Sequence, residues 1–180
     1  METIESLILK DPRRLAMLKM VASLQQEDIY IAAGFVRNLV WDFLHQDCID
    51  SASALNDVDV IFFDAQDKNN CRAEILQREL MLLDACIPWQ VKNQAHMHLK
   101  NNDSPYKSCG DAMSFWPEKE TAVAVRINLQ GNIEVLSPFG VDSLFKGLVS
   151  HNPKRDKSIF LKRVKKKDWL NIWPKLKLLV

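Results

Sequence analysis

Apolar residues recur along the first half of the chain with two different periods, which predict alternating helices and strands. The predicted elements are, in chain order, a helix from Asp11-Pro12 to about Gln26, a strand Ile29–Ala33, a helix that begins at Gly34, a strand Val58–Phe63 and a helix Cys71–Asp84. The Asp-Pro pair supplies a side-chain cap followed by a proline in the first turn, which is typical of a helix start.

The second half of the chain predicts mainly strands. Residues Trp89 to Leu99 alternate between apolar and polar side chains, which predicts a half-buried strand. The polar face of this strand carries Gln90, Lys92, Gln94, His96 and His98. The remaining predicted elements are a hairpin of Thr121–Leu129 and Asn132–Leu136, a short helix Val141–Leu148 and a tail Ser158–Leu179 that is helix-like up to Pro174. This order predicts an α/β (α+β) fold, in which helices flank a small mixed sheet.

The composition suits one folded domain. The chain has 180 residues, of which 47% are hydrophobic and 26% charged, so a real core is expected. No apolar run reaches the roughly 20 residues that a membrane span needs, and the N-terminus lacks a signal-peptide pattern, so a cytoplasmic protein without a membrane partner is expected. Four cysteines without paired spacing, namely Cys48, Cys71, Cys86 and Cys109, are expected to be reduced and mostly buried.

Charge is unevenly divided along the chain. The net charge is +1, but residues 151–180 hold ten Lys or Arg against two Asp. Residues 1–150 are therefore acidic, with 14 basic against 21 acidic side chains. The expected organisation is an acidic body, residues 1–150, and a basic C-terminal helix or tail, residues 151–180, packed on the same domain.

Two carboxylates stand on either side of Val58, where the second predicted strand of the chain begins. Because side chains alternate along a strand, Asp57 and Asp59 leave it by the same face. Neighbouring carboxylates repel each other unless a cation lies between them, and oxygen ligands of this kind suit Mg²⁺ or Mn²⁺. The alternative interpretation is an Asp turn at the strand start with one exposed carboxylate.

The order of these motifs resembles a known family. Gly-Phe-Val-Arg-Asn at residues 34–38, a helix, and Asp-Val-Asp-Val at residues 57–60 are similar to the nucleotidyltransferase domain of the polymerase-β superfamily. The closest resemblance is to its bacterial minimal nucleotidyltransferase family, and a more distant one is to tRNA CCA-adding enzymes and poly(A) polymerases. Three further blocks, Trp89–Ala95, Ala122–Ile127 and Leu136–Gly140, extend the resemblance over most of the chain.

The resemblance implies a polymerase-β-like fold, with residues 1–150 as the nucleotidyltransferase domain. It also implies a divalent-metal-dependent transfer of a nucleoside monophosphate from an NTP to a hydroxyl of a small molecule, RNA or protein. Asp57 and Asp59 would be the catalytic metal ligands. Gly34 would let the triphosphate approach backbone N–H groups at a helix start, unless it is an ordinary turn glycine. Arg37 would contact phosphate or would pair with Asp42 or Asp57; both options remain open.

The sequence departs from the family at the third carboxylate. Catalytic members carry an Asp or Glu on the next sheet strand, and the matching position here is Gln90. A glutamine side chain orients a hydroxyl group but does not take its proton. Glu134 is a fallback for the third carboxylate if the hairpin folds close enough. An alternative function is therefore a catalytically weak nucleotide- or RNA-binding module that retains the fold.

Two further groups of polar residues have more than one interpretation. His96 and His98 lack a third ligand at zinc-binding spacing, so they are expected to line the substrate side of the cleft with Lys92. The basic run in the tail either binds RNA phosphates or forms a solvated helix face, and Trp169 and Trp173 are expected to anchor that tail. The residues of this run are Lys162, Arg163, Lys165, Lys166 and Lys167.

Overall fold

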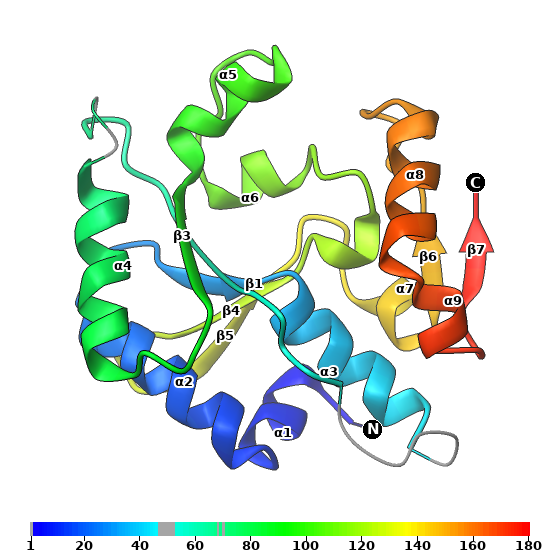
Figure 1. Cartoon of the computed structure of the whole chain (residues 1–180), viewed down its shortest axis with the longest axis horizontal. Helices are drawn as coiled ribbons and strands as arrows, with labels where there is room; N and C mark the ends of the chain where they lie inside the picture. The colour runs from blue at the N-terminus through cyan, green and yellow to red at the C-terminus, as the bar shows by residue number, and fades with distance from the viewer. Residues whose placement is uncertain (1, 47–52, 68, 70) are drawn as a thin grey trace.

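A five-stranded mixed sheet forms the centre of the molecule (Figure 1). The computed structural model describes residues 2–46, 53–67, 69 and 71–180. The sheet has the order β3-β2-β1-β4-β5, in which β2 and β3 are parallel and the other neighbours antiparallel. Its strands are β1 (Tyr30–Ala32), β2 (Val58–Phe62), β3 (Trp89–Asn93), β4 (Ala124–Ile127) and β5 (Ile133–Leu136). The expected α+β class, with helices around a small mixed sheet, is confirmed.

Helices cover both faces of the sheet, because alternate strand residues point to opposite sides. In β1, Ile31 faces a large core that includes residues of the first four helices, whereas Tyr30 and Ala32 face a smaller core. The first four helices are α1 (Ile4–Leu9), α2 (Pro12–Ser23), α3 (Gly34–Leu44) and α4 (Cys71–Leu83). The smaller core is closed by residues of α6 (Cys109–Met113). In β2 the same alternation brings Asp59 to the face of Ile61, on the side of the smaller core.

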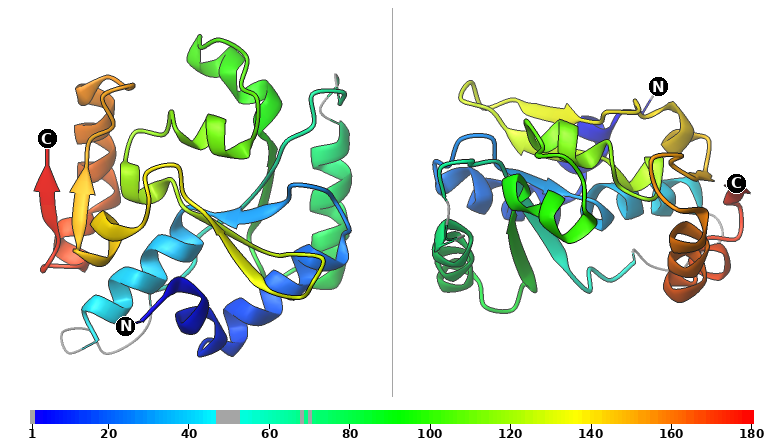
Figure 2. Two further views of the ribbon diagram at one scale, coloured as in Figure 1. Left: turned by 180° about the vertical axis from the view of Figure 1, so that it is seen from behind. Right: turned by 90° about the horizontal axis from the view of Figure 1, so that it is seen from above.

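The C-terminal segment packs on the side of the molecule opposite α4, as the two views of Figure 2 show. It consists of α7 (Asp142–Phe145), β6 (Leu148–Ser150), α8 (Lys157–Lys167), α9 (Trp169–Ile172) and β7 (Lys177–Leu179). Trp169 and Trp173 are buried and make edge-to-face contacts with Trp41 of α3, at centroid distances of 5.6 and 5.1 Å. These two tryptophans therefore anchor the tail to the body, as their spacing indicated.

Two predicted elements differ from the structure. The strand expected over Trp89–Leu99 ends at Asn93, and the chain continues as the 3₁₀ helix η1 (Gln94–His96) and α5 (Met97–Asn101). The buried Asn93 side chain accepts the N–H of Ala95 at 3.1 Å and thereby caps the new helix, which overrides the alternating pattern. The tail helix breaks at Asp168, which adopts a left-handed backbone with φ of 55°. The sequence pattern missed α1 and the parallel pair β6–β7.

The cysteine expectation is partly wrong. Cys109 is buried, but Cys71 and Cys86 are exposed, and all three are free thiols. Cys48 lies outside the described residues. Within the described part of the chain, none of the helices combines the length and the apolar character needed to cross a membrane.

Candidate active site

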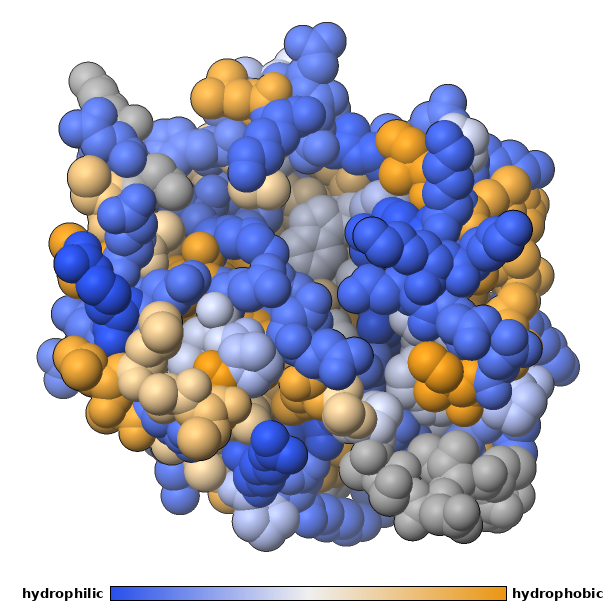
Figure 3. Space-filling model, viewed as in Figure 1, coloured by the Kyte–Doolittle hydropathy of each residue, from blue (hydrophilic) through white to orange (hydrophobic). Residues whose placement is uncertain are grey.

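A cleft with a volume of about 210 Å³ opens where β1 ends and β2 begins. Its walls come from the β1–α3 turn, the segment before β2, Thr121 at the end of η2 (Lys119–Thr121), and helices α8 and α9. Figure 3 shows this face of the molecule hollowed between α8 and the side that carries β3, α5 and α6, with mostly hydrophilic residues around the hollow. The cleft brings together Gly34, Arg37, Asp57 and Asp59, which the sequence had placed in one site.

Asp57 and Asp59 both open into this cleft, with 38% and 24% of their side-chain surface exposed. The Nζ of Lys92 lies 2.6 Å from Oδ1 of Asp59 and also donates to Oε1 of Gln90 at 3.0 Å. The Nζ of Lys167 lies 3.9 Å from Oδ2 of Asp57. Among the described residues, no backbone N–H donates to either carboxylate. Each carboxylate thus lies beside a lysine, and the role of the pair as metal ligands stays a prediction.

The β1–α3 turn leaves open space at Gly34. Ala33 has φ of 56° and ψ of −121°, a strained backbone for a residue with a side chain, and it starts α3 without a side-chain cap. Gly34 itself is not left-handed, and a Cβ there would meet only the side chains of Arg37 and Asn38, at 3.6 to 3.7 Å. The fold alone thus does not require glycine at position 34. The uncapped first turn of α3 opens into the cleft at this point, as an anion site at a helix start would.

Arg37 is a buried cation without a fixed anionic partner. Its guanidinium lies between the rings of Trp41 and Trp169, 4.8 and 4.4 Å from their centroids. It donates to the hydroxyl of Thr121 at 2.7 Å and to Oδ1 of Asn38 at 2.9 Å, while its buried Nε has no partner among the described residues.

Burial lowers the pKa of Arg37 to about 10, so the group is charged at neutral pH. The pairing with Asp42 or Asp57 that the sequence left open is absent from the described ion pairs. Asp42 instead accepts hydrogen bonds from Trp173 and Ser53.

One face of α8 adds two more cations to the cleft. Arg163 and Lys167, one helical turn apart, both line it. Arg163 binds the fully buried Glu118 through Nε at 2.6 Å and through its second nitrogen at 3.3 Å. Glu118 thereby fixes the guanidinium at the cleft wall. Asp57, directly before β2, and Asp59 on β2 thus face a site with three cationic side chains around it.

A nucleotidyltransferase family model matches residues 19–178 of the chain. A solved NMR structure described as a CCA-adding enzyme head domain is 30% identical, with a TM-score of 0.82 over 97% of this chain and 93% of that one. The chain belongs to this nucleotidyltransferase family. The family assignment confirms the expected relationship, and the match of the family model extends through the basic tail. No curated protein matches the chain in sequence.

More distant solved structures share the fold of this nucleotidyltransferase. A Thermotoga maritima CCA-adding enzyme complexed with tRNA is 12% identical, with a TM-score of 0.63 over 99% of this chain and 43% of that one. A CCA-adding enzyme in complex with CTP is 10% identical, with a TM-score of 0.57 over 95% of this chain and 48% of that one. The chain thus spans less than half the length of these two enzymes.

In this nucleotidyltransferase, Gln90 lies beside Asp59 but is not among the residues that line the cleft, so its place at the third catalytic position stays a prediction. It pairs in register with Asp59 on the neighbouring strand β3, and its side chain is exposed. Within the described residues, no group of three or more His, Cys, Asp or Glu side chains could hold a metal ion. Any metal site of this cleft would therefore use Asp57 and Asp59 together with ligand oxygens.

Glu134 does not reach the cleft, so the fallback for the third carboxylate is wrong. Its Oε2 accepts from Nε of Arg126, directly across the hairpin, at 2.7 Å. Arg126 also contacts Asp28, and all three residues line a different surface cavity. The register of β4 and β5 explains this position of Glu134, because it pairs Glu134 with Arg126 at the β5 edge of the sheet.

The two histidines are not cleft residues either. Because β3 ends at Asn93, His96 and His98 lie on η1 and α5 and contact backbone carbonyls. The Nε2 of His96 lies 2.6 Å from the carbonyl oxygen of Asp67, and Nδ1 of His98 lies 2.8 Å from that of Ala95. The expected position beside Lys92 in the substrate cleft is therefore wrong.

The basic run of the tail divides between two faces of α8. Lys162, Lys165, Lys166 and Lys167 are exposed, and Arg163 and Lys167 also line the cleft. RNA binding by this basic run stays a prediction. The sequence offered no sign that Arg163 faces the cleft, because its partner Glu118 lies 45 positions earlier in the chain. Glu118, Glu120 and Thr121 are buried.

Proposed function

We propose that this cleft binds a nucleoside triphosphate with Mg²⁺ or Mn²⁺ and transfers the nucleoside monophosphate to a hydroxyl group, releasing pyrophosphate. The observation that carries the proposal is the placement of two open carboxylates beside an unpaired buried arginine, Arg37, in one cleft. Arg37 is buried without a direct ion pair among the described residues, although the charges of Glu118, Asp57 and Asp59 oppose part of the effect of burial. A phosphate oxygen would add a close anionic partner. The solved complexes of CCA-adding enzymes with CTP and with ATP support this choice of ligand.

The triphosphate would lie in the phosphate end of the cleft, defined by Gly34, Arg37, Arg163 and Lys167. The free space over Gly34 lets phosphate approach the first turn of α3, where backbone N–H groups and the helix dipole favour an anion. Arg37 would contribute positive charge from the lining of the cleft, and Lys167 would add a second positive charge near the exposed surface. Arg163 is held by Glu118 and would orient the phosphates from the α8 side.

The donor set of the cleft fits a divalent cation. Mg²⁺ is commonly bound by one or two carboxylates together with substrate phosphates and water, which is the arrangement that Asp57 and Asp59 allow. When bound, such an ion supplies neutralisation of phosphate charge and activation of the attacking oxygen. Lys92 balances the charge of Asp59 and would bind the nucleotide from the β3 side.

The acceptor hydroxyl would receive little help from a general base. Gln90 stands beside Asp59, but its amide oxygen is already bound by Lys92 and does not accept a proton from a hydroxyl. This observation favours the second candidate function, a catalytically weak nucleotide- or RNA-binding module. The outward Lys162, Lys165 and Lys166 would bind RNA phosphates in either case, with an affinity that falls as salt rises.

The proposed reaction is tested with α-labelled NTPs, Mg²⁺ or Mn²⁺, and candidate acceptors, by following label transfer and pyrophosphate release. Transfer is expected to require the metal and to disappear in Asp57→Asn and Asp59→Asn. The matched control is Asp64→Asn, because Asp64 follows the same strand but lies outside the described cleft. Metal-independent NTP binding that neither cleft variant changes would contradict the assignment.

The variant Gln90→Glu separates the two candidate functions. A carboxylate at this position adds a group that can take the acceptor proton, and such help contributes about 10²–10⁴-fold. Turnover is expected to rise in Gln90→Glu and to fall again when Asp57→Asn is added. A protein that binds NTP but shows no transfer with or without Gln90→Glu is a binding module.

A further inference from the structure

A second cavity continues the cleft beyond Asp59. Its volume is about 380 Å³, and it shares Ala33, Asp59, Thr121 and Arg163 with the first cavity. The two cavities therefore form one groove, with Asp59 near its middle. The far part, here called the aromatic end of the cleft, is defined by Gln94, Met97, Asn101, Phe115 and Trp116.

The aromatic end differs from the phosphate end in its charge. The three cations that line it already have carboxylate partners in the described part of the structure. Lys92 binds Asp59, Arg155 binds Asp103, and Arg163 binds Glu118. The ligand of this end is therefore expected to be neutral, in contrast to the anion expected beside Arg37.

The remaining chemistry of the aromatic end suits a flat ring with polar edges. Phe115 and Trp116 are half-buried, so ring surface faces the cavity. The amide groups of Gln94 and Asn101 make only long hydrogen bonds, of 3.4 Å to the carbonyl of Lys92 and 3.3 Å to the hydroxyl of Tyr106. Within the described residues, no donor reaches their amide oxygens. These acceptors and weakly held donors remain available to the edge of a ring.

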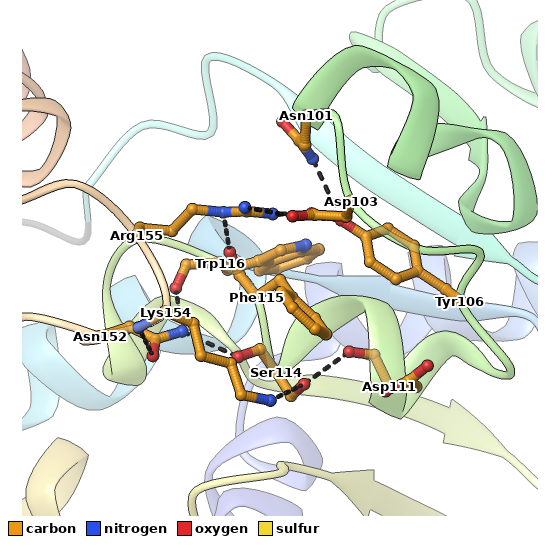
Figure 4. Close-up of polar contacts among 10 residues, drawn as sticks. All are labelled: Asn101, Asp103, Tyr106, Asp111, Ser114, Phe115, Trp116, Asn152, Lys154 and Arg155. Carbon is orange, nitrogen blue, oxygen red and sulfur yellow. Dashed lines mark hydrogen bonds and ion pairs between the residues drawn. The ribbon is translucent and has the colours of Figure 1, made fainter.

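The two aromatic residues are held in place by buried polar groups from the start of the tail, as Figure 4 shows. The side-chain nitrogen of Asn152 donates to the carbonyl oxygens of Ser114 and Trp116, both at 2.8 Å. The Nε of Arg155 donates to the carbonyl oxygen of Phe115 at 2.5 Å, and its guanidinium lies 5.4 Å from that ring. Three successive carbonyls are thus fixed, which gives a preorganised surface for stacking.

We propose that the aromatic end of the cleft binds a nucleobase, stacked on Trp116 and contacted at its edge by Gln94 and Asn101. This inference rests on the proposed function, because the aromatic end continues the same groove from the phosphate end. The base belongs either to the incoming NTP or to the terminal nucleotide of an RNA acceptor. Both sources present the same chemistry to Trp116, and stacking of this kind recognises any base through its π-face.

The inference is tested by calorimetric titration of the full chain in the presence of Mg²⁺. The three probes are ATP, inorganic tripolyphosphate and a short single-stranded oligoribonucleotide. Trp116→Leu is expected to weaken ATP or oligoribonucleotide binding by about tenfold or more, the usual effect of losing a stacking partner, and to leave tripolyphosphate binding unchanged. Trp116→Phe, which keeps a ring, is expected to retain most of the affinity. A fall in ATP affinity identifies the NTP base, and a fall in oligoribonucleotide affinity identifies the acceptor base.

The matched control is Lys154→Ala, because Lys154 contacts Phe115 at 4.2 Å and Ser114 at 3.0 Å without lining the cavity. Thermal melting of each variant verifies folding. If Trp116→Leu is folded and changes neither ATP nor oligoribonucleotide binding, or weakens tripolyphosphate equally, the nucleobase site is overturned. If the unchanged protein fails to bind tripolyphosphate, the proposed function itself is contradicted.

Discussion

Arg37 and Arg155 line the two ends of one groove, and both guanidinium groups lie over aromatic rings. Every nitrogen of Arg155 has a partner, since the side chain binds Asp103, Tyr106 and the carbonyl of Phe115. Arg37 has only neutral partners and an unpartnered Nε among the described residues. Hydrogen bonding to Asp103 raises the pKa of Arg155, whereas burial lowers that of Arg37. Arg155 is therefore a structural cation, whereas Arg37 is the cation to which we assign the phosphate.

The largest expected effect is on stability, in Arg155→Met. This change leaves Asp103, which has 13% of its side chain exposed, without its cationic partner. Removal of one member of a mostly buried pair costs about 3 kcal/mol or more in the free energy of unfolding. Urea denaturation measures the loss, and tripolyphosphate affinity should be unchanged while the protein is folded. A stable variant with weak tripolyphosphate binding would reverse the roles of the two arginines.

A smaller effect, on binding, is expected in Arg37→Met. The change removes a charge-assisted contact to phosphate and should lower tripolyphosphate affinity by roughly 10- to 100-fold. Stability should change far less than in Arg155→Met, because no carboxylate loses its partner. Calorimetric titration and urea denaturation of the same preparations give both values. Unchanged affinity in a folded Arg37→Met protein would show that Arg37 only fills the space between Trp41 and Trp169.

The third effect concerns the space beside Arg37, which Gly34→Ala fills. Since the added methyl group meets its protein neighbours at 3.6 Å or more, stability should be kept or rise by up to about 1 kcal/mol. Tripolyphosphate affinity should fall by roughly tenfold, because the added methyl group occupies space that the phosphate would need. One extra methylene group in a pocket has an effect of about this size. Gly110→Ala on α6 is the matched control, with its nearest contact at 3.4 Å to Leu136 and no part in the cleft. Equal affinities in both variants would place the phosphate elsewhere.

The smallest effect is on the pH dependence of stability. The hydrogen bond from Arg155 lowers the pKa of Asp103 below its ordinary 3.8. The pair therefore stabilises the protein fully above that ordinary value and loses its contribution as pH falls through the lower folded value. Arg155→Met should reduce this acid sensitivity in urea denaturation between pH 5 and the acid limit. Arg37→Met should leave it unchanged, since the lowered pKa of Arg37, about 10, matters only in alkaline solution.

The sequence placed part of the phosphate end in one site, but it missed the cleft-facing position of Arg163 and Lys167 and the whole aromatic end. Strand periodicity placed Asp57 and Asp59 on one face, and the family resemblance added Gly34 and Arg37 to the same site. The alternation after Trp89 was misleading because one buried side chain, Asn93, ends the strand. Local periodicity carries no information on such a capping contact.

Contacts between distant parts of the chain account for the remaining differences. Arg155 meets Asp103 across 52 positions, and Arg163 meets Glu118 across 45. Each pair joins two segments that are polar in sequence and therefore appear to be solvated surface. The charge pattern of the tail showed that basic residues were abundant, but it did not show which of them line the cleft.

The contacts of Trp169 and Trp173 also set an order of events during synthesis. Trp173 donates to Asp42, 131 positions earlier, and Trp169 covers the guanidinium of Arg37. A ribosome releases residues from the N-terminus onward, so the body of the protein emerges before the wall of its own cleft. Until α9 has been made, Trp41 and Arg37 are uncovered and the phosphate end lacks one side. The proposed nucleotide site is therefore complete only late in translation, when the chain has grown past residue 173.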